Sequence, residues 1–128
     1  MLEYIRLAEA GIEQGITLSV GGSLVTGTLV SGQKFFDLLG KEILDAKSKS
    51  IGDTQIYENL KSNYDYFGKM LSEVKDNPDD PVPLRNYVHL MSARMLFGNH
   101  SVPTSGGMLW RGKVQAVDAF FCGLITKG

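Results

Sequence analysis

The chain has 128 residues, 43% of them hydrophobic, and a formal net charge of -1 at pH 7. This length suits one compact domain with its own core and is short for two, and the near-zero charge does not suit a globally basic nucleic-acid binder. Residues 84–128 nevertheless carry 5 Lys and Arg against 1 Asp, whereas residues 1–83 carry 8 against 13 acidic residues, so either a small basic face or merely solvated charges lie in the C-terminal third.

Residues 2–14 predict a short amphipathic helix that ends at Gly15, a residue suited to the left-handed conformation that closes helices. The stretch from Ile16 to Gln33 has no charged residue, and β-branched residues recur at period two on both sides of Gly21-Gly22. This pattern predicts a β-hairpin with a tight turn at the glycine pair. Gly27, inside the second strand, predicts a bulge or sharp bend that lets a small sheet curl.

Residues 33–49 and a segment that begins near Asp53 predict two helices that pair as a helical hairpin. Asp53 suits the N-cap position of the second helix. The apolar stripes consist of Phe35, Phe36, Leu39 and Ile43 in the first helix and Ile56, Leu60, Phe67, Leu71 and Val74 in the second. Stripes this wide are typical of packing faces rather than binding grooves.

The segment DNPDDPVP, residues 76–83, predicts a turn or linker, because neither a helix nor a central strand passes through so many prolines. Beyond it, residues 86–97 predict a strand, residues 99–107 a loop, and residues 108–125 two strands around Arg111-Gly112. The simplest interpretation of that dipeptide is a tight turn with the guanidinium in solvent.

These elements predict a mainly β fold with an α insert: a five-stranded bent barrel, preceded by an N-terminal helix and interrupted by two helices between its second and third strands. We expect a single domain over residues 1–128. Its parts are residues 1–32, the helix and first hairpin; residues 33–83, the helical insert and linker; and residues 84–128, the last three strands.

The single cysteine, Cys122, stands in the apolar run AFFCGLI and is expected to be a buried small side chain. No apolar run approaches the roughly 20 residues of a membrane span, and the first ten residues are too charged for a signal peptide. We therefore expect a cytoplasmic protein without membrane contact.

Residue patterns for catalysis or metal binding are not found in the sequence. His89 lies mid-strand, as a satisfied sheet histidine does, and His100 lies in a loop, with no ligand cluster around either. No GxSxG, Walker A or GxGxxG pattern occurs, and Gly21-Gly22 and Gly106-Gly107 suit hairpin turns. Asp79 and Asp80 lie in the linker, where no rigid element holds them as an acid/base pair. The sequence predicts no enzyme, no metal and no cofactor.

The segments SLVTGTLV and NYVHLMSA (residues 86–93) and the Arg-Gly that follows Trp110 resemble motifs of the Sm-like (LSm) family of small β-barrels. The resemblance implies a homo-oligomeric ring of about five to seven subunits whose pore holds single-stranded RNA. It implies RNA-binding positions in two loops at the pore, where an Asn bonds a base and an Arg flanks it. These positions are Asn86, Arg111 and Gly112, with Arg85 and Lys113 beside them.

The segments VHL, SVPTSGG, WRGKV and VDAFFCG, within residues 87–125, are also similar to the C-terminal part of the gas vesicle accessory protein U family, small bacterial proteins associated with gas vesicles and their clustering. This resemblance implies that Trp110, Phe120 and Phe121 are partner-binding residues. The alternative is a core Trp with core or inter-subunit phenylalanines. Ala119, Phe120 and Phe121 are apolar enough to be covered by a neighbouring subunit.

Two functions follow from these patterns. The first is an Sm-like ring that binds single-stranded RNA through Asn86 and Arg111, with the planar groups and donors that splayed bases require. The alternative is a non-enzymatic assembly protein of the gas vesicle accessory type, which binds a protein partner through an apolar patch.

Overall fold

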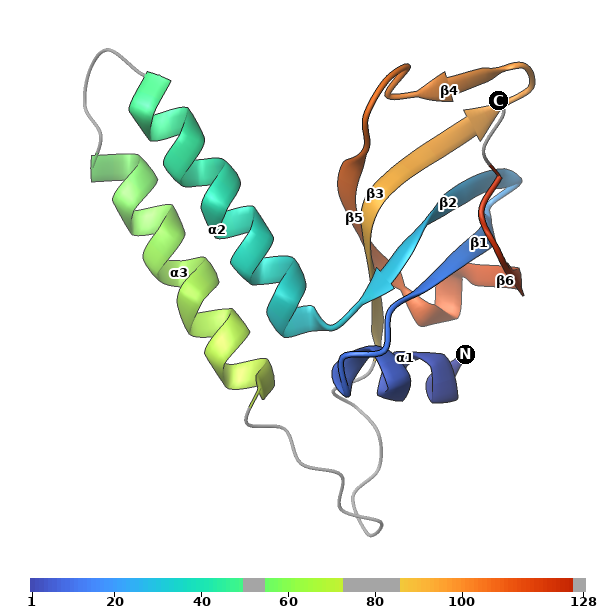
Figure 1. Ribbon diagram of the computed structural model, residues 1–128, viewed down its shortest axis with the longest axis horizontal. Helices are drawn as coiled ribbons and strands as arrows, with labels where there is room; N and C mark the ends of the chain where they lie inside the picture. The colour runs from blue at the N-terminus through green and yellow to red at the C-terminus, as the bar shows by residue number, and fades with distance from the viewer. Residues whose placement is uncertain (50–54, 73–85, 126–128) are drawn as a thin grey trace, which may run out of the picture. The chain divides into compact units, whose positions relative to one another are not determined.

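The structure is a computed structural model that describes residues 1–49, 55–72 and 86–125 (Figure 1). The elements, in chain order, are α1 (Leu2–Glu9), β1 (Gln14–Val20), β2 (Ser23–Val30), α2 (Gly32–Lys49), α3 (Gln55–Ser72), β3 (Tyr87–Phe97), β4 (His100–Val102), β5 (Met108–Lys113), a 3-10 helix (Val114–Ala116) and β6 (Val117–Cys122). They divide into two compact units, which we call the sheet unit (Met1–Ser31 with Asp79–Gly128) and the helical unit (Gly32–Pro78). The fold is therefore mixed α and β, with two helices between the second and third strands as predicted.

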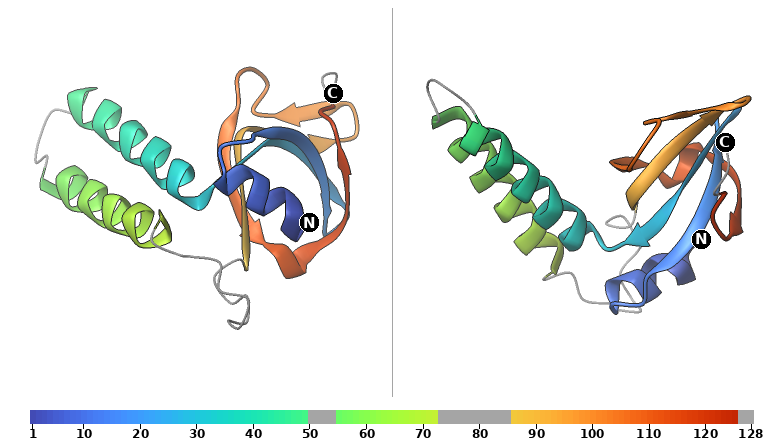
Figure 2. Two further views of the ribbon diagram at one scale, coloured as in Figure 1. Left: turned by 60° about the horizontal axis from the view of Figure 1, so that its bottom comes forward. Right: turned by 45° about the horizontal axis from the view of Figure 1, so that its top comes forward.

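The six described strands of the sheet unit form one open antiparallel sheet. Five of them follow the order β4-β3-β2-β1-β6, and β5 joins the sheet by pairing with β3. The 11-residue strand β3 carries two partners on one side, because β5 pairs with its first part and β4 with its end. The prediction of five strands with a loop over residues 99–107 was wrong in this detail: the chain turns tightly after Phe97, and His100–Val102 adds a short strand. Figure 2 (left) shows that the sheet curls so that α1 lies across its open end.

Glycines shape the first hairpin as predicted. Gly21 and Gly22 form the turn between β1 and β2. Their φ angles are +57° and +85°, values that residues with a Cβ rarely adopt. At Gly27 the pairing of β2 with β3 shifts register between Thr26 and Thr28. A Cβ on Gly27 would come 3.1 Å from both Cα and Cβ of Ala93, so the two strands approach more closely here than a larger residue normally allows.

The core of the sheet unit lies between the inner face of the sheet and α1. Its buried members are Ala8, Ile16, Leu18, Val25, Leu29, Val88, Leu90 and Ala93. The predicted end of the N-terminal helix was wrong, since α1 stops at Glu9 and Gly11 takes the left-handed φ of +89°. Gly15 instead lies in β1, and its missing side chain leaves room for Leu124.

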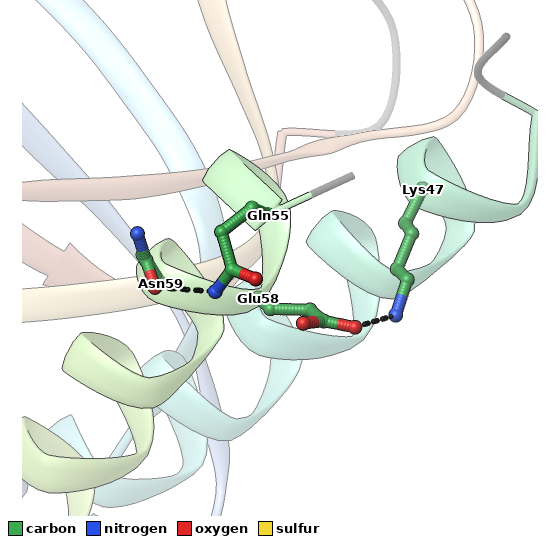
Figure 3. A network of polar contacts seen from close by, with 4 residues as sticks. All are labelled: Lys47, Gln55, Glu58 and Asn59. Atoms are coloured by element: carbon green, nitrogen blue, oxygen red, sulfur yellow. Dashed lines mark hydrogen bonds and ion pairs between the residues drawn. The ribbon is translucent and has the colours of Figure 1, made fainter. Parts of the chain in front are cut away.

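The helical unit consists of α2 and α3 side by side, which confirms the predicted helical hairpin (Figure 1). Phe36 is its centre, with ring centroids 6.1 Å from Tyr64 and 5.7 Å from Phe67. At the other end of the pair, Lys47 Nζ lies 2.5 Å from Glu58 Oε1 and ties the helices together (Figure 3). The predicted stripe of α3 is only partly covered, because the side chain of Ile56 is 62% exposed.

Several expectations fall on residues outside the described ranges. These are the N-cap at Asp53, Val74 in the second stripe and the linker over residues 76–83. Among the helices that the structure describes, none is long and apolar enough to cross a membrane.

Candidate functional site

Strand β5 runs straight through Arg111 and Gly112. The dipeptide was predicted to form a tight turn between two strands or to lie in a pore loop, and both predictions were wrong because it lies within one strand. The break between the last two strands comes three positions later, at the 3-10 helix Val114–Ala116. There the backbone N–H of Val114 donates to the carbonyl of Asn86 at 2.8 Å, and Lys113 pairs with Tyr87.

Asn86, Arg111, Gly112 and Lys113 therefore lie together at one end of the β3–β5 ladder. This cluster contains four of the five predicted RNA-binding residues. The fifth, Arg85, lies outside the described residues.

Packing explains why glycine follows Arg111. A Cβ on Gly112 would stand 2.4 Å from Cη2 and 2.8 Å from Cζ2 of Trp110, so the indole ring lies over the space that glycine leaves. Residues i and i+2 of a strand share one face, which is why these two residues meet. Trp110 also packs against the buried core and pairs with Leu90. This geometry favours the core interpretation of Trp110.

Arg111 is held by two neighbours on β3. Its Nε donates to Nε2 of His89 at 3.0 Å, and its guanidinium carbon lies 3.6 Å from the ring centroid of Tyr87. Burial, and then the positive charge of Arg111, lower the pKa of His89 from 6.5 to about 4. His89 is therefore neutral at pH 7 and accepts the hydrogen bond, which confirms the satisfied sheet histidine.

Strand β6 carries the longest run of exposed apolar side chains on the described strands. The strand pairs with β1 on one side only, and its residues Ala119, Phe120 and Phe121 are exposed, the phenylalanines at 37% and 51%. The ring of Phe120 meets that of Tyr4 edge-on, with centroids 5.7 Å apart. We call Ala119, Phe120 and Phe121 the β6 edge patch.

Cys122, which ends β6, is exposed, so the prediction of a buried cysteine was wrong. The apolar run around it suggested a buried side chain, whereas the strand lies at the edge of the sheet. A hydrogen bond with Cys122, and next the negative charge of its thiolate form, raise the pKa of Tyr4 above its ordinary value.

Comparisons with known proteins bear on the whole chain. A family model described as gas vesicle protein GvpU-like matches residues 1–125. The chain belongs to the GvpU-like family. No curated protein and no solved structure matches it. The match extends through α1, the first hairpin and the helical unit, beyond the C-terminal segments that carry the resemblance to the gas vesicle accessory protein U family. No comparison supports the Sm-like resemblance.

Sequence reasoning missed one feature of this GvpU-like chain, the segment Gly123–Ile125 that follows β6. It returns across the sheet and bonds to residues of β1, β2 and β3, among them the buried Thr17 and Thr26. Thr17 and Thr26, which face each other on β1 and β2, are the sequence signal that could have revealed it, because buried hydroxyls need hydrogen-bond partners. Among the described residues, no group of three or more His, Cys, Asp or Glu is placed to hold a metal ion.

Proposed function

We propose that this protein is a non-enzymatic accessory protein of gas vesicles that acts by binding a protein partner through the β6 edge patch. The observation that carries the proposal is the family match, which covers residues 1–125. The family's description associates it with gas vesicles, and an accessory role in their assembly or clustering fits a small chain without a recognisable catalytic motif.

The chemistry of the β6 edge patch fits a protein partner. An edge strand presents unpaired backbone N–H and C=O groups, and natural proteins usually protect such edges with charge, proline or bulges. Here Ala119, Phe120 and Phe121 are consecutive and exposed instead. Aromatic side chains are enriched at protein interfaces, and an added strand supplies both main-chain hydrogen bonds and cover for the rings.

Self-association belongs to the same proposal. Among the described strands, β4 and β5 pair with β3 only and β6 pairs with β1 only, so the sheet has one open edge at β4 and β5 and another at β6. Pairing β6 of one copy with β5 of the next would satisfy both edges and repeat around a ring. The ring of about five to seven subunits implied by the Sm-like resemblance is one closed form of this arrangement.

The partner surface is tested by comparing two exposed phenylalanines. Phe121 on β6 is 51% exposed and Phe97 at the far end of β3 is 47% exposed, so Phe97→Ser is a matched control for Phe121→Ser. Purified variants are incubated with gas vesicles, the buoyant vesicles are floated, and bound protein is quantified. We expect Phe121→Ser to lose at least about tenfold in affinity, as a central aromatic anchor does, and Phe97→Ser to bind normally. Equal binding of the two variants would contradict a role for the patch.

Single-stranded RNA binding is a second candidate, favoured by the placement of Asn86, Arg111 and Lys113 at one end of the β3–β5 ladder. A guanidinium, an ammonium group and an amide are the donors that RNA bases and phosphates accept. Fluorescence anisotropy of short U-rich and A-rich RNA at two salt concentrations tests it. Binding that weakens with salt and with Arg111→Ala would support this candidate, and no binding at low salt would eliminate it.

A further inference from the structure

The segment Gly123–Ile125, which we call the strap, is bound across the face of the sheet like a short peptide. The N–H of Gly123 donates to the carbonyl of Gly15 at 2.9 Å, and the carbonyl of Gly123 accepts from Thr17 Oγ1 at 2.9 Å. Two residues later, the N–H of Ile125 donates to Thr26 Oγ1 at 3.0 Å, and its carbonyl accepts from Arg94 Nη2 at 2.6 Å. The partners come from three strands, β1, β2 and β3.

This pattern satisfies the N–H and C=O of alternate residues, which is how a β-strand is recognised along one edge. The intervening residue, Leu124, is held differently. Its side chain occupies the space over Gly15, where a Cβ would come 2.7 Å from Leu124 Cγ. We call the surface formed by Gly15, Thr17, Thr26 and Arg94 the strap groove.

The threonines of the strap groove link its two ends. Thr17 Oγ1 and Thr26 Oγ1 are 3.0 Å apart, and the two residues are 0% and 2% exposed. Each hydroxyl has one proton, so all contacts are satisfied when Ile125 N–H donates to Thr26, Thr26 donates to Thr17, and Thr17 donates to the carbonyl of Gly123. A chain of this kind is strengthened by cooperativity, and without the strap both buried hydroxyls lose a partner.

We propose that the strap groove is a binding site for an extended C-terminal segment, and that in the self-associated protein the segment that fills it comes from a second copy of the chain. The groove requires a residue that presents both backbone groups at the first position, an apolar side chain over Gly15 at the next, and both backbone groups again at the third. The strap of another copy meets each requirement with the same contacts. Exchange of identical segments is a low-cost route to association because no contact has to be invented.

Two features of the strap favour exchange. It begins at Gly123, whose φ of +120° is open to glycine and rarely to other residues, so the backbone is free to change direction where the strap leaves β6. Leu124 is 50% exposed, so the strap is anchored mainly by its hydrogen bonds and buries little apolar surface. A segment with few buried contacts opens more readily than the core. Since an empty groove leaves buried hydroxyls unsatisfied, a second strap is the favoured replacement.

The proposal goes beyond the gas vesicle role and does not depend on it, because it concerns the purified chain alone. It is tested by complementation between two full-length variants. Gly15→Val closes the groove to Leu124 and leaves the chain's own strap intact. Ile125→Pro removes the N–H that Thr26 accepts and leaves the groove intact. The two variants carry different tags, are mixed, and are recovered through the tag on Gly15→Val.

We expect the Gly15→Val chain to capture the Ile125→Pro chain at least about tenfold better than it captures a chain that carries both substitutions, which has neither a usable strap nor an open groove. Equal capture of the two would overturn the proposal, because association through the sheet edges alone would not distinguish them. If circular dichroism shows that Gly15→Val is unfolded, Thr26→Val replaces it as the variant with a disabled groove, with the same criterion. Flotation with gas vesicles is independent of this result, so failure of exchange and failure of the accessory role are separate outcomes.

Discussion

The Gly112→Ala substitution should force the indole of Trp110 off the core. The new Cβ would lie 2.4 Å from Trp110 Cη2, whereas nonbonded carbons pack at about 3.5–4.0 Å. The ring must therefore move by about 1 Å. Overpacking of this size costs about 1–3 kcal/mol. Replacing a strand glycine by alanine recovers about 0.5–1 kcal/mol of backbone entropy, so we expect a net loss of about 0.5–2 kcal/mol in the free energy of unfolding.

Trp110 is the only tryptophan in the chain, so its fluorescence reports this site alone. We expect a red-shifted emission in Gly112→Ala and a melting temperature lower by about 2–8 °C, from about 4 °C per kcal/mol for a domain of this size. Gly40→Ala is the control: its Cβ would meet Asp65 Oδ1 at 3.5 Å and Lys61 Cγ at 3.8 Å, both ordinary contacts, so the emission should not change.

A double-mutant cycle isolates the contact between Trp110 and Gly112. In a Trp110→Leu background the ring is absent, so Gly112→Ala should be neutral or slightly stabilising when unfolding is followed by circular dichroism. The same loss of stability in both backgrounds would refute the reasoning, because it would mean that the indole is not what requires glycine at this position.

Three further predictions concern the pH dependence of stability, the threonine pair and the helix pair. The pKa of His89 is lowered to about 4 in the folded state, so the unfolded state binds the proton first, and the free energy of unfolding falls by up to about 3 kcal/mol as the pH drops from about 6.5 to about 4. Urea unfolding of His89→Gln should show a shallower fall over this pH range. An unchanged dependence of stability on pH would contradict this assignment. Thr26→Val should lower the free energy of unfolding by about 1–3 kcal/mol because buried partners are left unsatisfied. Thr28→Val, on the same strand and only half-buried, should lower it less in the same urea assay. Equal losses would argue against the hydrogen-bond chain. Lys47→Met should lower the stability of the two paired helices by less than about 1 kcal/mol despite the short contact of Lys47 with Glu58, because both side chains are solvent-accessible. A larger loss in thermal denaturation would show that Lys47 and Glu58 form more than a surface ion pair.

Much of the fold follows from local patterns. The glycine pair at Gly21-Gly22 needs positive φ angles, and Gly27 needs close approach of a neighbouring strand, so both positions could be interpreted without the structure. The 3.6-residue period of α2 and α3 likewise predicted two helices that share a face. These signals are local. The structure departs from the local patterns in where α1 ends, in the additional strand β4 and at Arg111-Gly112, which lies within β5.

The candidate site was harder to predict because it depends on which strands lie at the edge. Period-two alternation identifies the two faces of a strand and says nothing of its place in the sheet, so Cys122 was assigned to the interior although β6 is an edge strand. The Arg111-Gly112 dipeptide resembled a turn, because the need for glycine arises from the side chain of Trp110 rather than from the backbone. Thr17 and Thr26 indicate that buried hydroxyls need partners, but spacing does not reveal that the strap supplies them, since its own partners lie on three separate strands.

The accessory role is tested most directly by flotation of the wild-type protein with gas vesicles from which it has been removed. After low-speed centrifugation, the amount of protein in the buoyant layer is compared with that in the liquid below, over a range of added protein. The proposal predicts saturable recovery with the vesicles, reduced by Phe121→Ser and not by Phe97→Ser. If the wild-type protein stays in the liquid at every concentration, it does not bind gas vesicles and the proposed function is wrong.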